Sequence, residues 1–95
     1  MSSAKAEIST AADRFLEAFK REAIQVEEVE RIGIDPIDGV LHLYVLVSEL
    51  TPEIRQRLRR IKNACWDRHR DLEIDLFVSS GADESFSAVQ TIFQR

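Results

Sequence analysis

The 95-residue sequence lacks the features that mark secreted, membrane and disulfide-bonded proteins. Its single cysteine cannot form an internal disulfide and cannot supply the four ligands of a structural zinc site. No apolar run approaches the roughly 20 residues that a bilayer span requires. The N-terminal residues also lack the apolar core of a signal peptide. These absences predict a cytoplasmic protein without a membrane segment.

The sequence also lacks the common catalytic motifs: it contains no P-loop, no GxGxxG and no GxSxG. A hydrolase or a dinucleotide enzyme is therefore unsupported, and no cofactor or metal is expected. Cys65 and His69 lie four residues apart near the end of a predicted helix, where both could contact one metal ion. Because no third ligand lies nearby, a buried cysteine and an exposed histidine are the favoured interpretation.

The composition is that of a soluble globular chain, with 44% hydrophobic and 32% charged residues. Residues 1–95 are expected to form one domain, with residues 1–9 flexible. The net charge of -4 conceals a basic segment, because residues 51–70 hold seven basic residues and only two acidic ones. Such segregated charge suits an acidic partner or self-association of opposite patches.

The most apolar and β-branched run, residues 40–47, predicts a central strand. Its odd positions predict a face buried in the core: Leu41, Leu43, Val45 and Val47. Its even positions predict a second, amphipathic face: Val40, His42, Tyr44 and Leu46. Whatever the protein does is expected to happen on or beside this second face.

The segments before this strand predict a helix and a hairpin. Thr10 and Asp13 resemble a capping box, so a helix is expected to begin at Thr10 and to bury Phe15 and Phe19. Residues 29–35 predict a short strand. Residues 35–39 supply turn chemistry, which indicates an antiparallel hairpin with the central strand.

The segments after it predict a helix, a strand and a last helix. Thr51 and Pro52 are typical of a helix N-terminus, and this helix should run to about Arg68. Residues 72–78 alternate cleanly and should form a strand parallel to the central one through a right-handed crossover. A last helix is expected to begin at Asp83 or Ser85 and to use the following apolar residues: Phe86, Val89, Ile92 and Phe93.

The predicted order is helix, strand, strand, helix, strand, helix, which indicates a two-layer α+β fold with a mixed sheet of at least three strands. Helices would cover one sheet face and leave the other partly open. Beside Glu73 and Asp75, that open face would carry the candidate interaction residues: Val40, His42, Tyr44, Leu46 and Phe77. Such an apolar patch is a reasonable dimer surface.

Two further groups of residues have a chemical interpretation. One helix ridge joins basic and aromatic side chains that could hold phosphates and stack a base: Arg55, Arg59, Lys62 and Trp66. A solvated flank with Trp66 over the core edge is the favoured alternative. His42, Tyr44 and Asp75 should point the same way from neighbouring strands, so they are weak candidates for acid and base catalysis, although a structural role is favoured.

The layout resembles the minimal nucleotidyltransferase domain of the DNA polymerase β superfamily. Residues 43–47 correspond to the family's Asp-bearing strand, residues 72–78 to its third strand and residues 86–95 to its closing helix. Asp75 alone matches a catalytic residue by type. His42 and Tyr44 stand where the family has its Asp-x-Asp pair, and Ile34 follows Gly33 where the family has serine. The resemblance therefore implies a domain that has lost metal-dependent nucleotidyl transfer.

Similar layouts occur in KH-like domains, in ferredoxin-like domains and in the cytoplasmic domains of cation-efflux transporters. The leading hypothesis is a non-catalytic protein-interaction module, either a homodimer or a subunit of a small complex. Binding of RNA or single-stranded DNA along the basic helix is the first alternative. Weak metal-dependent nucleotidyl transfer is the second.

Overall fold

A computed structural model describes residues 3–81 and 90–95, with the backbone alone described for residues 3–10. Its elements follow the chain in this order: α1 (Ser3–Ala23), β1 (Val29–Ile37), β2 (Val40–Val47), α2 (Pro52–Trp66), β3 (Glu73–Ser80) and β4 (Gln90–Gln94). None of the described helices combines the length and the apolar character that a membrane span needs.

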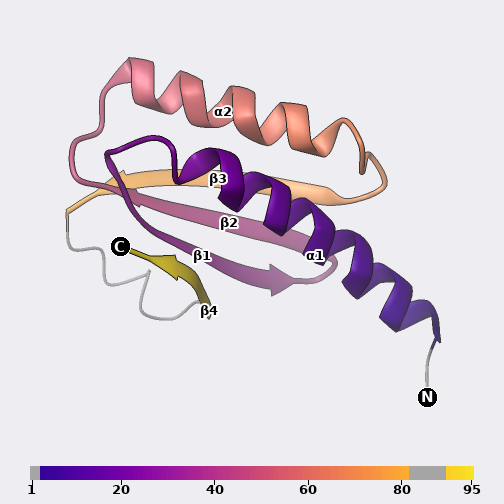
Figure 1. Cartoon of the computed structure of the whole chain (residues 1–95). Helices are drawn as coiled ribbons and strands as arrows, with labels where there is room; N and C mark the ends of the chain where they lie inside the picture. Colours follow the sequence, from indigo (N-terminus) through magenta and orange to yellow (C-terminus); the bar gives the residue numbers. More distant parts are fainter. Residues whose placement is uncertain (1–2, 82–89) are drawn as a thin grey trace.

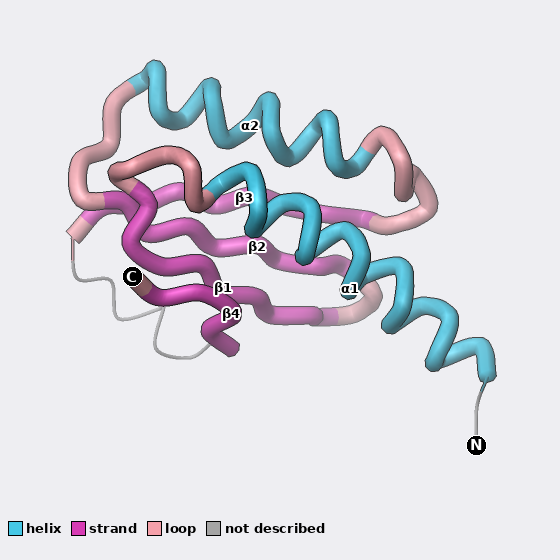
Figure 2. The backbone as a smooth tube through the Cα atoms, viewed as in Figure 1, coloured by secondary structure: helices cyan, strands magenta, loops and turns pink. Residues whose placement is uncertain are grey.

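The four strands form one mixed sheet in the order β3-β2-β1-β4. β1 pairs antiparallel with both β2 and β4, and β2 pairs parallel with β3. Both helices lie on the same side of the sheet (Figures 1 and 2). The predicted two-layer α+β fold with a mixed sheet is therefore confirmed. The central position of β2, between β1 and β3, is confirmed as well.

The core lies between the two helices and the covered face of the sheet. The odd residues of β2 are almost fully buried there, as their alternation predicts: Leu41, Leu43, Val45 and Val47. Phe15 and Phe19 of α1 are fully buried and stack with their ring centroids 6.1 Å apart. From α2, Leu58 and Cys65 complete the contact with α1 and the sheet.

The β1–β2 turn is tighter than the turn predicted over residues 35–39. Strand pairing continues to Ile37 opposite Val40, so only Asp38 and Gly39 remain in the loop. Both residues have positive φ angles, 52° for Asp38 and 80° for Gly39. Two-residue hairpin loops prefer this geometry because it matches the twist of the strands, and Asp-Gly is a favoured sequence for it. Pro36 is accommodated inside the strand, opposite Leu41.

The two helix N-termini differ in how well the sequence located them. Thr51 caps α2 as predicted, because its Oγ1 accepts a hydrogen bond of 3.2 Å from the backbone N–H of Ile54. α2 ends at Trp66, slightly before the expected Arg68. α1 begins at Ser3, so the helix starts earlier than predicted and Thr10 lies within it. The alanine-rich N-terminal segment favours this earlier start.

The predicted C-terminal helix is wrong for residues 90–94, which form β4. β4 pairs with the outer edge of β1, where Thr91 lies opposite Gly33 and Gln94 opposite Arg31. Ile92 and Phe93 still pack against the core, as their apolar character required. The earlier part of the predicted helix, including Phe86 and Val89, lies outside the described residues.

Arg95 links β4 to the loop between α1 and β1. Its guanidinium group donates hydrogen bonds to the backbone carbonyls of Val29 at 2.9 Å, Ile24 at 3.0 Å and Val26 at 3.4 Å. The same group lies 5.7 Å from the ring centroid of Phe93. Charged donors form stronger hydrogen bonds than neutral ones, so these contacts fix the loop against the sheet.

Candidate interaction surfaces

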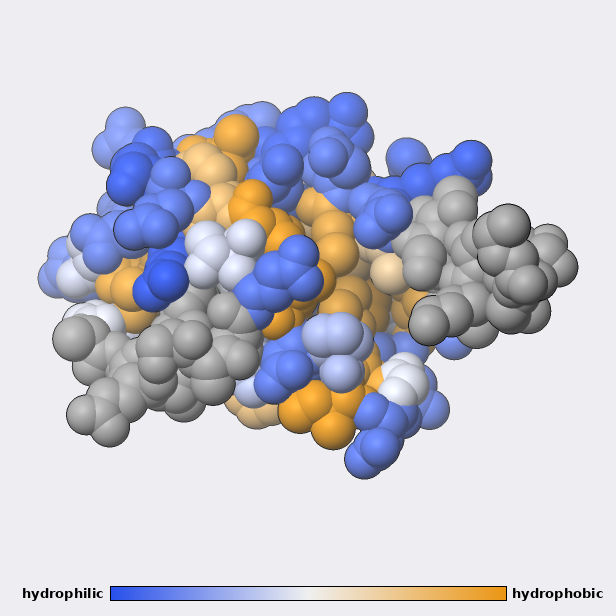
Figure 3. Space-filling model, turned by 90° about the horizontal axis from the view of Figure 1, so that it is seen from below, coloured by the Kyte–Doolittle hydropathy of each residue, from blue (hydrophilic) through white to orange (hydrophobic). Residues whose placement is uncertain are grey.

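No described helix lies on the second face of the sheet, because both described helices lie on the other side. Figure 3, seen from below, shows apolar surface exposed beside polar side chains. The even residues of β2 point to this face and are half-buried: Val40, His42, Tyr44 and Leu46. Phe77 of β3 lies opposite Tyr44 and stays 45% exposed, although it is a large apolar side chain. The structure therefore brings all five predicted interaction residues together on one face. We call this surface the open face.

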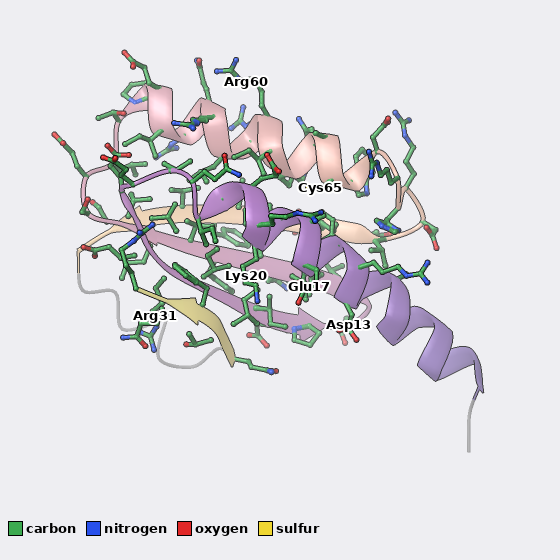
Figure 4. The ribbon with its side chains drawn as sticks, viewed as in Figure 1. Asp13, Glu17, Lys20, Arg31, Arg60 and Cys65 are labelled. Atoms are coloured by element: carbon green, nitrogen blue, oxygen red, sulfur yellow. The ribbon has the colours of Figure 1, made fainter. Side chains whose placement is uncertain are left out.

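β1 adds residues to the open face that the sequence reasoning missed. Ile37 pairs with Val40 and is 44% exposed, and Arg31 pairs with Leu46. Arg31 donates from Nε to Thr91 Oγ1 of β4 at 3.2 Å (Figure 4). Gly33 lies opposite Tyr44 and places no side chain beside the phenol ring. The sequence did contain a signal for these residues. Because Ile32 and Ile34 face the core, the odd-numbered residues of β1 must face the other side of the sheet.

Three rings on the open face form one aromatic cluster. The Phe77 ring stacks on Tyr44, with the centroids 5.2 Å apart, and on His42, with the centroids 5.8 Å apart. The ring planes are inclined by 20° and 15° respectively. Stacked pairs of this kind stabilise each other by about 1 kcal/mol beyond their buried area. The cluster is therefore a pre-ordered apolar platform on the open face.

His42 also makes polar contacts to both neighbouring strands. Its Nδ1 lies 3.2 Å from the backbone oxygen of Asp35, so this nitrogen carries the proton and donates. Its Nε2 lies 3.9 Å from Oδ2 of Asp75, an ion pair only when the imidazole is protonated. The structure thus brings His42 and Asp75 together, while Tyr44 stacks on Phe77. These contacts are typical of cross-strand packing, and a catalytic role for the trio stays a prediction.

The basic ridge of α2 faces β3, which lies at one edge of the described sheet. Arg55, Arg59 and Lys62 line one wall of a groove of about 210 Å³, and Leu76 and Val78 of β3 line the other. The ridge therefore borders a real groove between two elements, which the helix periodicity alone did not show. Whether it binds nucleic acid stays a prediction.

Trp66, at the end of this ridge, has a structural role. Its Nε1–H donates a hydrogen bond of 2.7 Å to the backbone oxygen of Leu72, which closes the loop between α2 and β3. Lys62 Nζ and the guanidinium carbon of Arg70 each lie 5.6 Å from the centroid of its ring. The indole is half-buried and packs against the core, as in the favoured sequence interpretation.

Cys65 lies at a second, shallow groove between α1 and α2, where Figure 4 shows it on the α1-facing side of α2. Only 8% of the residue is exposed. Burial raises the pKa of the Cys65 thiol above its ordinary value, and the negative charge of Glu22 raises it further. The thiol is therefore protonated at neutral pH and is a weak nucleophile.

Within residues 3–81 and 90–95, no group of three or more His, Cys, Asp or Glu side chains could hold a metal ion together. No family model matches the chain, and no curated protein matches it by sequence. Among solved structures, the chain is similar to the zinc form of a MamM CTD variant. The two are 17% identical with a TM-score of 0.46, over 93% of this chain and 99% of that one. A likeness at this level supports no conclusion about function.

Proposed function

We propose that the chain is a non-catalytic protein-interaction module that self-associates through the open face. The observation that carries this proposal is the aromatic and aliphatic surface on the sheet side opposite both helices. Phe77 and Ile37 are 45% and 44% exposed there, and the half-buried β2 residues lie between them. Tyr and Phe are enriched in the buried centres of interfaces, where they carry much of the binding energy.

The polar groups beside this patch support an interface better than an active site. His42 Nδ1 donates to the backbone oxygen of Asp35, and Nε2 lies 3.9 Å from Oδ2 of Asp75, so neighbouring strands engage both ring nitrogens. A protein partner could leave these contacts intact while covering the aromatic cluster. A second copy of the chain is the simplest partner, since a two-fold axis would place the same apolar patch on both sides.

The size of the open face predicts the strength of the association. Strands of eight or nine residues at about 3.3 Å per residue are about 26 Å long, and three strands spaced about 4.8 Å apart are about 14 Å wide. The projected area of the open face is thus about 370 Å². This area is small beside the roughly 800 Å² of accessible surface that each partner buries in a standard stable interface. We therefore expect a weak, concentration-dependent dimer, as is typical of interfaces at the small end of the size range.

A matched pair of isoleucines tests the surface. Ile37 lies on the open face and is 44% exposed, whereas Ile24 follows α1 and is 37% exposed. Sedimentation velocity over a concentration series should show weaker self-association for Ile37→Ser and no change for Ile24→Ser. Equal behaviour of the two variants would assign any association to another surface. A protein that stays monomeric up to about 1 mM would remove the proposal.

A further inference from the structure

β3 is an edge strand in the described part of the sheet, because β2 is its only described strand neighbour. In such a strand, every second residue directs its N–H and C=O groups away from the sheet. These groups can pair with an added extended chain, which then continues the sheet. β3 is eight residues long and contains no proline, so its length and composition permit such pairing.

The side chains of β3 that face the helices are incompletely covered. Leu43 and Val45 of β2 are fully buried beneath the helices. In contrast, Leu76 and Val78 of β3 are only half-buried and line the groove beside α2. The outer margin of the core is therefore an apolar floor that a further strand could cover.

The charge above this floor is strongly positive. Three cationic side chains of α2 line the groove, Arg55, Arg59 and Lys62, whereas Asp75 is the single acidic residue among its described lining residues. The spacing of the cations also suits an extended chain. Arg55 and Arg59 are four residues apart, a rise of about 6 Å along a helix. Side chains at alternate positions of a strand are about 6.6 Å apart, nearly the same distance.

We propose that this groove binds an acidic, extended peptide segment of a partner protein, which adds to β3 as a further strand. Its backbone would pair with the outer edge of β3. Its acidic side chains, at alternate positions, would meet Arg55, Arg59 and Lys62. Its intervening side chains would point to the opposite sheet face, beside Phe77, and should be apolar. The groove lies between α2 and β3 on the helix side of the sheet, whereas self-association is proposed for the open face, so the peptide is a second partner that meets the open face only beside Phe77.

Single-stranded nucleic acid fits the groove less well. Its binding sites combine positive charge with aromatic faces on which bases stack. The floor of this groove is aliphatic, formed by Leu76 and Val78. Trp66, the aromatic residue of the ridge, donates its N–H to Leu72 and has a cation 5.6 Å from its ring centroid. A peptide uses both the aliphatic floor and the strand edge, whereas a nucleic acid uses neither.

Fluorescence anisotropy with labelled, end-blocked peptides tests the proposal on the full chain. The probe is an octapeptide of alternating Glu and Val, and the charge control has Lys in place of Glu. A third peptide keeps the Glu-Val sequence but carries N-methyl groups at every second residue on the edge that would face β3. The acidic probe should bind, and the lysine peptide should not. N-methylation should weaken binding at least about tenfold, because it removes the backbone donors of an added strand.

Two variants with the same change of charge identify the groove. Arg59→Glu should weaken binding of the acidic probe at least about tenfold, because it places a negative charge beside the peptide carboxylates. Arg57→Glu is the matched control, since Arg57 is also an exposed residue of α2 but does not line the groove. Circular dichroism should show that both variants are folded.

Several outcomes would overturn the inference. Equal loss in the Arg57 and Arg59 variants would mean that only net charge matters. Binding that N-methylation leaves unchanged would exclude strand addition. Tighter binding of oligothymidylate than of the acidic peptide would favour nucleic acid, and no binding of any probe would leave the ridge as a solvated flank. Self-association should persist in Arg59→Glu and weaken in Ile37→Ser, so the two proposals fail separately.

Discussion

Replacement of Phe77 by serine should weaken self-association more than any other single truncation on the open face. Phe77 is 45% exposed and is the central ring of the aromatic cluster. A phenylalanine presents about 200 Å², so about 90 Å² of Phe77 is available for burial by a partner. At about 25 cal/mol per Å², complete burial contributes about 2 kcal/mol for each copy.

The proposed two-fold dimer would bury Phe77 from both copies, so the contribution would double to about 4 kcal/mol. This value is an upper bound, because part of the area stays at the rim and serine retains some contact. If half of it is lost, the dimer weakens by about 2 kcal/mol, or about 30-fold in the dissociation constant. The change is large enough to resolve by sedimentation equilibrium.

The assay compares the unmodified chain, Phe77→Ser and Ile24→Ser over the same concentration series. Thermal unfolding at low concentration measures any loss of stability in the monomer, since the substitution also removes the stacking on His42 and Tyr44. A dissociation constant for Phe77→Ser within about twofold of the unmodified value would refute the reasoning. So would an equal effect of Ile24→Ser, which changes an exposed apolar residue outside the strands that form the open face.

Two further predictions concern stability and reactivity. Arg95→Ala should lower the free energy of unfolding by about 2 kcal/mol, because it leaves three backbone carbonyls without their charged donor. Urea denaturation measures this loss, and a change below about 0.5 kcal/mol would show that water replaces the guanidinium group. Cys65 should react with a disulfide reagent far more slowly at pH 8 in the folded chain than in urea, because burial raises its pKa. Equal reaction rates in the folded chain and in urea would contradict this prediction. Because the folded pKa is the higher one, the stability that the protonated thiol contributes is full below its unfolded pKa and is lost as the pH rises through its folded pKa.

Local patterns were sufficient for most of the helices and strands. The alternation of Leu41, Leu43, Val45 and Val47 identified a strand with one buried face. Thr51 and Pro52 located the start of α2, because the cap satisfies a backbone donor within the same turn. These signals involve residues close in sequence, so the chain alone determines them.

The candidate open face was also predictable in part. Residues with even numbers on β2 must share a face, and Phe77 must join them once β3 pairs in parallel register. The contribution of β1 required the register of the hairpin. A shift of one residue would have turned Ile37 to the opposite side of the sheet.

The sequence by itself determined the two-layer α+β class, the buried side of β2 and the basic ridge of α2. Only the tertiary structure decided that residues 90–94 form a strand. The apolar pair Ile92 and Phe93 fits the periodicity of a helix as well as that of a strand, and the hydrogen-bonding partner of the strand is the outer edge of β1, far away in the sequence. Strand order likewise placed β3 at an edge of the described sheet, where the ridge of Arg55, Arg59 and Lys62 forms one wall of a groove. Pairing between strands far apart in the chain depends on the global minimum of free energy, and no local pattern encodes it.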